Sequence, residues 1–210
     1  MKTKFIIISI LLVINAYPQI KIQEQSIDNG IVHKNIINTI DTLSIDLLKI
    51  DLSTKEYELR SVKANNLLNS KETTSEMVKT LTDSGYNVVA AINADFFEAD
   101  GEIINNMISE GNFVKAVKFT DSPFNPFVNT QFAITEDKKL LMDQFVFNGQ
   151  LILPDGISEP ISRINSKADS NSVTLYNSFQ GEYTPTAEVN WFVSEINLQS
   201  IKKNHDTLFC

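Results

Sequence analysis

The chain has 210 residues, of which 42% are hydrophobic and 21% are charged, a composition that suits one core-bearing domain and excludes a disordered chain. Eighteen Lys and Arg against 26 Asp and Glu give a formal net charge of −8, which argues against a general binder of nucleic acids or anionic membranes. The single cysteine, Cys210, excludes an intrachain disulfide and a cysteine-based metal cluster.

The first residues have the pattern of an export signal. Lys2 and Lys4 precede an apolar run over residues 5–15, which falls short of the roughly 20 residues needed to span a bilayer. We therefore predict a signal peptide at residues 1–16, cleaved between 16 and 19; the alternative is an N-terminal core strand or helix. No cysteine follows the run for lipid attachment, so we expect an exported protein, periplasmic or extracellular, with no stable membrane anchor.

Alternating hydrophobicity predicts strands along much of the remaining chain. Residues 44–52 place Leu48 and Ile50 on one face and charged side chains on the other, which is typical of a half-buried strand. A polar turn leads to a predicted return strand at residues 57–64, and residues 31–40 are a weaker strand prediction ahead of both.

One helix is predicted, at about residues 73–84. Thr73 and Glu76 fit a capping box at its start, and Gly85 is placed to end it in a left-handed conformation. Residues 86–92 follow and are apolar on both sides, which predicts a buried central strand.

Several later strands are expected in hairpins. Gly111–Asn112 predicts a turn between strands at 108–110 and 113–119, and Asn148–Gly149 predicts another between strands at 145–147 and 151–153. The predicted fold class is α+β, a strand-rich mixed sheet with hairpins and one helix. Further strands are expected at residues 131–135, 140–142, 173–176 and 188–196, and loops at 122–126 and 166–172.

The most distinctive segment is residues 91–111, AINADFFEADGEIINNMISEG, where an apolar stretch runs into amides, acids and rings. Loops at the end of a buried strand often carry functional sites. Phe96 and Phe97 cannot both face one side of a strand, so we expect one to pack inward and the other to form a wall for a sugar ring. The polar residues of the segment are Asn93, Asp95, Glu98, Asp100, Glu102 and Glu110.

The residues alone leave three interpretations open: a solvated acidic loop, an oxygen-ligand site for calcium, and a carboxylate pair of a glycosidase. The EF-hand register fails, because Phe96 would take its first position when Asp100 takes its fifth. His33 and His205 lie near opposite ends of the chain, which argues against zinc. Nucleotide-binding and serine-hydrolase motifs are absent from the sequence, and we expect no cofactor, with a divalent cation such as calcium as the alternative.

The segment resembles the phosphodiester glycosidase family, which includes the enzyme that removes the covering N-acetylglucosamine from mannose-6-phosphate tags. The resemblance rests on Asn93-Ala-Asp-Phe-Phe97, on Gly101 and on Asn106-Met-Ile-Ser-Glu-Gly111. It implies one family domain over residues 25–210. The flanking stretches that match in the same order are residues 48–60, 73–92, 129–134 and 173–176, so the resemblance covers about residues 31–195.

The resemblance implies a hydrolase that cleaves a sugar-phosphodiester or related glycosidic bond in a polysaccharide or wall glycan. Its partner would be a carbohydrate or glycosyl-phosphate, not a nucleic acid. A carboxylate stabilises the oxocarbenium-like transition state, and a departing phosphate is held by donors or cations. The implied catalytic residues are Asp95, Asn93 and Glu110, and the implied substrate-binding residues are Phe96, Phe97, Gly101, Asn106 and Gly111.

The family's second half has an Arg-Thr-Ala-Ile-Gly strand and an Asp-Gly-Gly-Gly-Ser loop, and neither occurs in this sequence. We therefore expect an N-terminal portion of the domain, catalytically incomplete by itself, with an unpaired sheet edge that lowers solubility. The alternatives are a non-catalytic secreted carbohydrate-binding domain and an exported structural domain.

Overall fold

The computed structural model describes residues 20–54, 56–118, 130–199, 202–204 and 207–209. The chain divides into two compact units, Met1–Glu58 and Leu59–Cys210. The structure is 11% helical and 36% strand, which confirms the strand-rich fold with one α-helix in the described ranges. The predicted signal peptide and the predicted loop at 122–126 lie outside the described residues.

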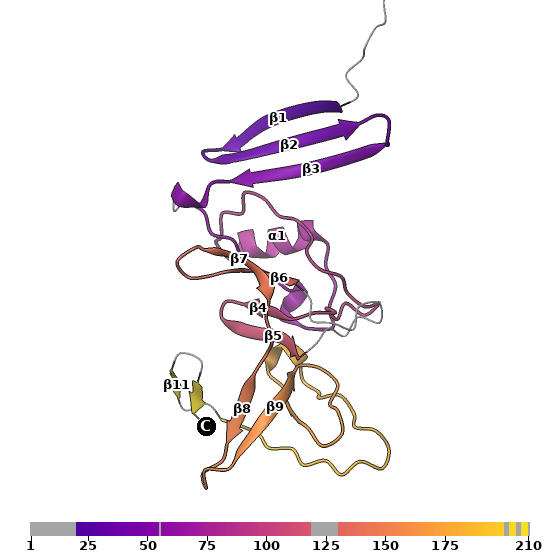
Figure 1. Ribbon diagram of the computed structural model, residues 1–210, viewed down its shortest axis with the longest axis vertical. Coiled ribbons are helices and arrows are strands. Elements are labelled where there is room, and N and C mark those ends of the chain that lie inside the picture. The colour runs from indigo at the N-terminus through magenta and orange to yellow at the C-terminus, as the bar shows by residue number, and fades with distance from the viewer. Residues whose placement is uncertain (1–19, 55, 119–129, 200–201, 205–206, 210) are drawn as a thin grey trace, which may run out of the picture. The chain divides into compact units, whose positions relative to one another are not determined.

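The first unit is a three-stranded antiparallel meander in the order β1-β2-β3 (Figure 1). Its strands β2 (Ile31–Asn38) and β3 (Leu43–Ile50) confirm two predictions, whereas β1 (Ile20–Asp28) lies where no strand was predicted. The return strand predicted at 57–64 is wrong. The chain leaves β3 through a 3-10 turn at Leu52–Thr54, and β3 pairs with β2 instead.

The second unit begins its regular structure with helix α1 (Thr74–Asp83), as the sequence predicts. The Thr73 hydroxyl accepts a hydrogen bond from the Glu76 amide at 3.2 Å, and the Glu76 carboxylate accepts one from the Thr73 amide at 2.7 Å. Gly85, with φ 95°, follows the helix in the left-handed conformation that the sequence predicts. The start of the helix is therefore set by side-chain hydrogen bonds, and its end is marked by a left-handed glycine.

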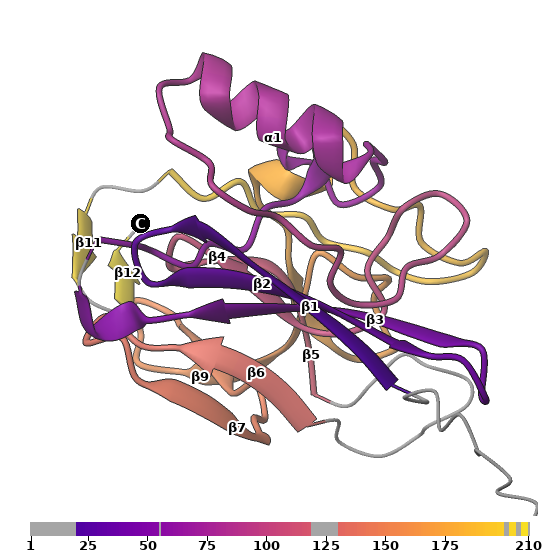
Figure 2. The same ribbon diagram turned by 90° about the horizontal axis from the view of Figure 1, so that it is seen from above.

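A five-stranded sheet is built around β9 (Ser158–Ile164). Strand β9 pairs antiparallel with β5 and β8 and parallel with β10. The hairpins β6–β7 and β11–β12 form separate two-stranded sheets, and β6–β7 is visible in Figure 2. The remaining strands are β4 (Met107–Ser109), β5 (Asn112–Val117), β6 (Thr130–Ile134), β7 (Leu140–Gln144), β8 (Gly149–Ile152), β10 (Val173–Leu175), β11 (Lys202–Asn204) and β12 (Thr207–Phe209).

Two predicted turns are corrected by the structure. The β4–β5 turn is Glu110–Gly111, one residue earlier than predicted, and both residues have positive φ, 50° and 72°, as a type I′ turn requires. The turn predicted at Asn148–Gly149 is wrong, because Gly149 is the first residue of β8. A Cβ at Gly149 would lie 2.7 Å from the ring of Phe147, so this glycine serves close packing.

Three further predicted strands are absent from the described sheets. Residues 86–92, 145–147 and 188–196 carry no strand assignment, and Ile92 and Val189 are 76% and 88% exposed. The buried central strand predicted after α1 is therefore wrong. Its composition favours a strand, but no described strand pairs with this segment.

The hydrophobic core of the second unit consists of Leu68, Ile103 and Val114, with Met107 and Phe179 packed against it. Ile103 belongs to the distinctive acidic segment of the sequence. The core therefore fixes that segment against β5.

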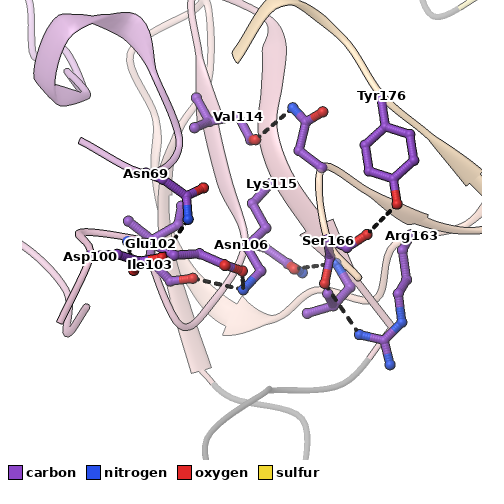
Figure 3. Close-up of polar contacts among 12 residues, drawn as sticks. Asn69, Asp100, Glu102, Ile103, Asn106, Val114, Lys115, Arg163, Ser166 and Tyr176 are labelled. Carbon is purple, nitrogen blue, oxygen red and sulfur yellow. Dashed lines mark hydrogen bonds and ion pairs between the residues drawn. The ribbon is translucent and has the colours of Figure 1, made fainter. Parts of the chain in front are cut away.

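A buried amide bridges three parts of the sheet. Asn165 is fully buried and donates from Nδ2 to the Val114 carbonyl at 2.9 Å and to Asn177 Oδ1 at 2.6 Å. Figure 3 shows the bond at Val114 and, beside it, the Tyr176 hydroxyl donating to the Ser166 carbonyl at 3.0 Å. These bonds anchor the start of the connection at residues 165–172, which is shorter than the dozen or so residues that parallel neighbours usually need.

Candidate functional site

The acidic segment folds as a short hairpin over residues 96–104. The Ile104 amide donates to the Phe96 carbonyl at 3.1 Å, and the Glu98 amide donates to the Glu102 carbonyl at 2.7 Å. The Gly101 amide closes the tip by donating to the Glu98 carbonyl at 2.9 Å. The segment is thus an ordered reversal of the chain rather than an open loop.

Gly101 sits where the hairpin tip touches residues 69–71. Its φ is 97°, and a Cβ there would lie 2.5 Å from the Ser70 carbonyl oxygen, a distance that no side chain tolerates. Asn69 donates from Nδ2 to the Asp100 carboxylate at 2.5 Å, and Lys71 Nζ donates to a carbonyl of the tip at 2.5 Å. The glycine is required by this close approach.

Lys115 anchors the base of the hairpin from β5. Its side chain is 2% exposed, and Nζ lies 2.7 Å from Glu102 Oε1 and 2.8 Å from the Ile103 carbonyl oxygen (Figure 3). A buried ammonium is tolerated because these oxygens replace its water. Glu102 therefore has a structural partner inside the fold.

Two charged groups at the contact between the hairpin tip and residues 63–72 have shifted pKa values, Asp100 and Lys63. The pKa of Asp100 lies below its usual value, chiefly because its carboxylate accepts the Glu102 backbone N–H at 3.0 Å. The pKa of Lys63 is also lowered, because burial disfavours its ammonium more than Asp100 and Glu72 stabilise it. Lys63 is 8% exposed and donates to the Ser70 carbonyl, so it supports the same contact.

Glu110 is held at the β4–β5 turn by an ion pair rather than by the other predicted catalytic groups. Its carboxylate lies 2.8 Å from Arg60 Nη1, and the Arg60 guanidinium lies 4.4 Å from the centre of the Tyr86 ring. Among the described residues, no hydrogen bond or ion pair joins Glu110 to Asn93 or Asp95. The visible role of Glu110 is to fasten the hairpin.

Asn106 and Gly111 also have visible structural roles. The Asn106 side chain accepts a hydrogen bond from the Val117 amide at 2.7 Å, which ties the start of β4 to the end of β5 (Figure 3). Gly111 completes the type I′ turn, and a Cβ there would meet nothing within 4 Å. Their roles in substrate binding stay predictions.

Asn93 and Asp95 both lie at the surface just before the hairpin. Asn93 Oδ1 accepts a hydrogen bond from the Thr74 hydroxyl of α1. Asp95 has φ 65°, and its Oδ1 accepts hydrogen bonds from the Phe96 amide at 2.8 Å and from Asn105 Nδ2 at 3.3 Å. Each side chain is therefore oriented through one oxygen on an exposed residue.

Phe96 and Phe97 are 79% and 59% exposed, so the prediction that one of them packs inward is wrong. The hairpin's buried position is taken by Ile103, the bridge partner of Phe97. Two adjacent rings thus stand at the surface beside an amide and a carboxylate. We call Asn93, Asp95, Phe96 and Phe97 the 93–97 surface.

The residues that orient this surface were missed by sequence reasoning. Thr74 followed a threonine already assigned to the helix cap, and Asn105 carried no pattern of its own. Lys115, which anchors the base of the hairpin instead, was also missed, although a lysine inside the apolar run of β5 indicates a buried partner.

The described residues contain no group of three His, Cys, Asp or Glu side chains placed to hold a metal ion. No helix among them is long and apolar enough to cross a membrane.

Comparison with known protein families, with curated proteins and with solved structures finds no match to this chain. The family resemblance therefore stays a prediction that rests on residues 93–111 and their flanks. The case for a binding site rests on the chemistry of the 93–97 surface.

Proposed function

We propose that the 93–97 surface binds a saccharide, and that the protein is an exported hydrolase of glycosidic or sugar-phosphodiester bonds in a polysaccharide or wall glycan. The observation that carries the proposal is the exposure of Phe96 and Phe97 beside exposed Asn93 and Asp95. Two exposed rings next to each other in the sequence offer an apolar surface on which a ligand can stack. A sugar matches this surface, since it has an apolar C–H face and hydroxyl groups at its edge.

The chemistry of each group supports cleavage next to a sugar ring. The Asp95 carboxylate, oriented by Asn105, is suited to stabilise positive charge at the anomeric carbon or to transfer a proton there. The Asn93 amide is suited to donate to a hydroxyl or phosphate oxygen. Phe96 and Phe97 would hold the ring in place.

A non-catalytic saccharide-binding domain is the second proposed function. Most glycosidases use two carboxyl groups. Three acids of the segment already have partners in the fold: Asp100 with Asn69, Glu102 with Lys115, and Glu110 with Arg60. Because these three carboxylates are engaged in structural contacts, the arrangement favours saccharide binding without turnover.

Two assays on residues 17–210 test these functions. Turnover is measured on the methyl phosphodiester of N-acetylglucosamine 1-phosphate, and binding is measured by calorimetry with the same compound and with soluble wall-glycan oligosaccharides. Asp95→Asn is expected to lower turnover at least about 100-fold. Asp143→Asn is the matched control, because the Asp143 carboxylate also accepts the amide of its successor, at 2.7 Å.

The rings are tested by Phe96→Ala and Phe97→Ala, each expected to weaken binding about 2- to 12-fold. Phe132→Ala, at a ring 55% exposed on β6, is the control. Binding that depends on the rings without turnover supports the second function. No binding of any of these saccharides would contradict both.

A further inference from the structure

We infer that Thr74 is a positioning residue of the 93–97 surface, which fixes the Asn93 amide so that its oxygen faces α1 and its two Nδ2 N–H groups are left for a ligand. The inference rests on the proposed saccharide site. The inference extends that site to Thr74, a residue of helix α1 that no motif of the sequence indicated.

The two threonines at the start of α1 have different partners. The Thr73 hydroxyl is used within the capping box with Glu76. The half-buried Thr74 hydroxyl instead donates to Asn93 Oδ1, 19 residues further along the chain. The helix cap is complete without Thr74, and threonine is a weaker helix former than alanine, so the helix itself gives no reason for this hydroxyl.

The orientation of the amide follows from electrostatics. The first turn of a helix carries partial positive charge on its free N–H groups, which favours an oxygen over an NH₂ group beside it. With Oδ1 held by Thr74, Nδ2 has no hydrogen-bond acceptor among the described residues. Asn93 therefore presents donors, which suit the oxygen atoms of a hydroxyl, an acetamido group or a phosphate.

Thr74 also restrains the Asn93 side chain at a point where no strand pairing holds the backbone. Residues 86–92 belong to no sheet, and residues 91–95 are all exposed. Because no strand ladder holds the segment, the hydrogen bond to α1 is the side-chain contact that restrains the Asn93 amide. Loss of that bond widens the range of amide orientations and raises the entropic cost of binding.

The test compares Thr74→Val, which removes the donor at nearly constant shape, with Thr74→Ser, which keeps it. Thr80→Val, at an exposed threonine of the same helix, is the matched control. Binding of the N-acetylglucosamine 1-phosphate methyl diester is measured by calorimetry for the chain of residues 17–210. Thr74→Val is expected to weaken binding about 3- to 10-fold, the effect of one hydrogen bond, while the serine variant and the control stay within about twofold.

A second arm separates positioning from a general loss of structure. In an Asn93→Ala background, Thr74→Val is expected to cause no further loss of binding, because the two changes act through one group. NMR signals of the Asn93 Nδ2 protons report the contact without ligand, and Thr74→Val is expected to move them to the values of unrestrained asparagine amides.

Three results would overturn the inference. Unchanged Nδ2 signals in Thr74→Val would show that the hydroxyl does not orient the amide. If Thr74→Val binds the diester like wild type while Asn93→Ala binds it more weakly, the orientation of the Asn93 amide does not matter for binding. Asn93→Ala binding like wild type would refute the proposed site itself, and the inference would fall with it.

Discussion

Replacing Glu102 is expected to destabilise the second unit more than replacing Lys115, although the two side chains form one ion pair. The Lys115 side chain is 2% exposed and the Glu102 side chain is 28% exposed. Removal of Glu102 leaves the buried Lys115 ammonium without the carboxylate that lies 2.7 Å from it. Removal of Lys115 instead leaves the Glu102 carboxylate, which water can reach. The cost of burying charge therefore decides the order.

The magnitudes follow from these environments. Glu102→Met is expected to lower the free energy of unfolding by about 3–5 kcal/mol, the range for removing one partner of a buried pair. Lys115→Met is expected to cost about 1–3 kcal/mol, because the Ile103 carbonyl loses the 2.8 Å hydrogen bond from Nζ. The double variant is expected to lie within about 2 kcal/mol of wild type, since two apolar chains replace the pair.

Urea unfolding followed by the fluorescence of Trp191, the single tryptophan, measures these differences in the second unit. Lys79→Met is the control, because Lys79 pairs with Asp83 on the exposed side of α1 and its loss is expected to cost at most about 0.5 kcal/mol. Equal losses for the two methionine variants, or a larger loss for Lys115→Met, would refute the reasoning.

Gly101→Ala is expected to cost about 2–4 kcal/mol and to lower the melting temperature more than Gly85→Ala. Both glycines have positive φ, but only at Gly101 would the added Cβ lie 2.5 Å from a backbone atom. Equal shifts in melting temperature would contradict the clash. Asn165→Leu is expected to cost about 2–4 kcal/mol in urea unfolding, since its buried partners lose their hydrogen bonds; a loss below about 1 kcal/mol would show the network to be dispensable. Acidification from about pH 5 to about pH 2 is expected to destabilise wild type more than Asp100→Asn. The Glu102 N–H lowers the pKa of Asp100 in the folded state, so its contribution is complete above the ordinary pKa of about 3.9 and is lost as the pH falls through the folded pKa; parallel urea midpoints would contradict this linkage.

The elements that could be predicted from sequence are those whose cause is local. The capping box of Thr73 and Glu76 and the left-handed Gly85 define α1 within a few residues, so its limits were predicted correctly. The same holds for the hairpin β6–β7, whose polar turn lies between two short apolar runs. The β4–β5 turn was misplaced by one residue, because both Gly111–Asn112 and Glu110–Gly111 have turn-forming composition and only the strand register distinguishes them.

In the candidate site, too, the sequence predicts the features with a local cause and misses those that depend on the fold. The sequence identified Asn93, Asp95 and the two rings, since their types and order are unusual. It did not predict that both rings would be exposed, because that depends on Ile103 filling the core position of the hairpin. Nor did it predict Thr74 as the partner of Asn93, since the two residues meet only through folding.

The sequence by itself determined the strand-rich character of the fold, the helix α1 and the location of the polar segment, because propensity, capping and hydrophobic period act over a few neighbouring residues. Only the tertiary structure decided which apolar runs became strands and which acids became anchors. Residues 86–92 favour a strand, but no strand in the described part of the chain pairs with them, and Glu102 became an anchor because β5 brings the Lys115 ammonium within 2.7 Å of it. Pairing of strands and burial of charge both need a second segment of the chain, and its position is set by the whole fold.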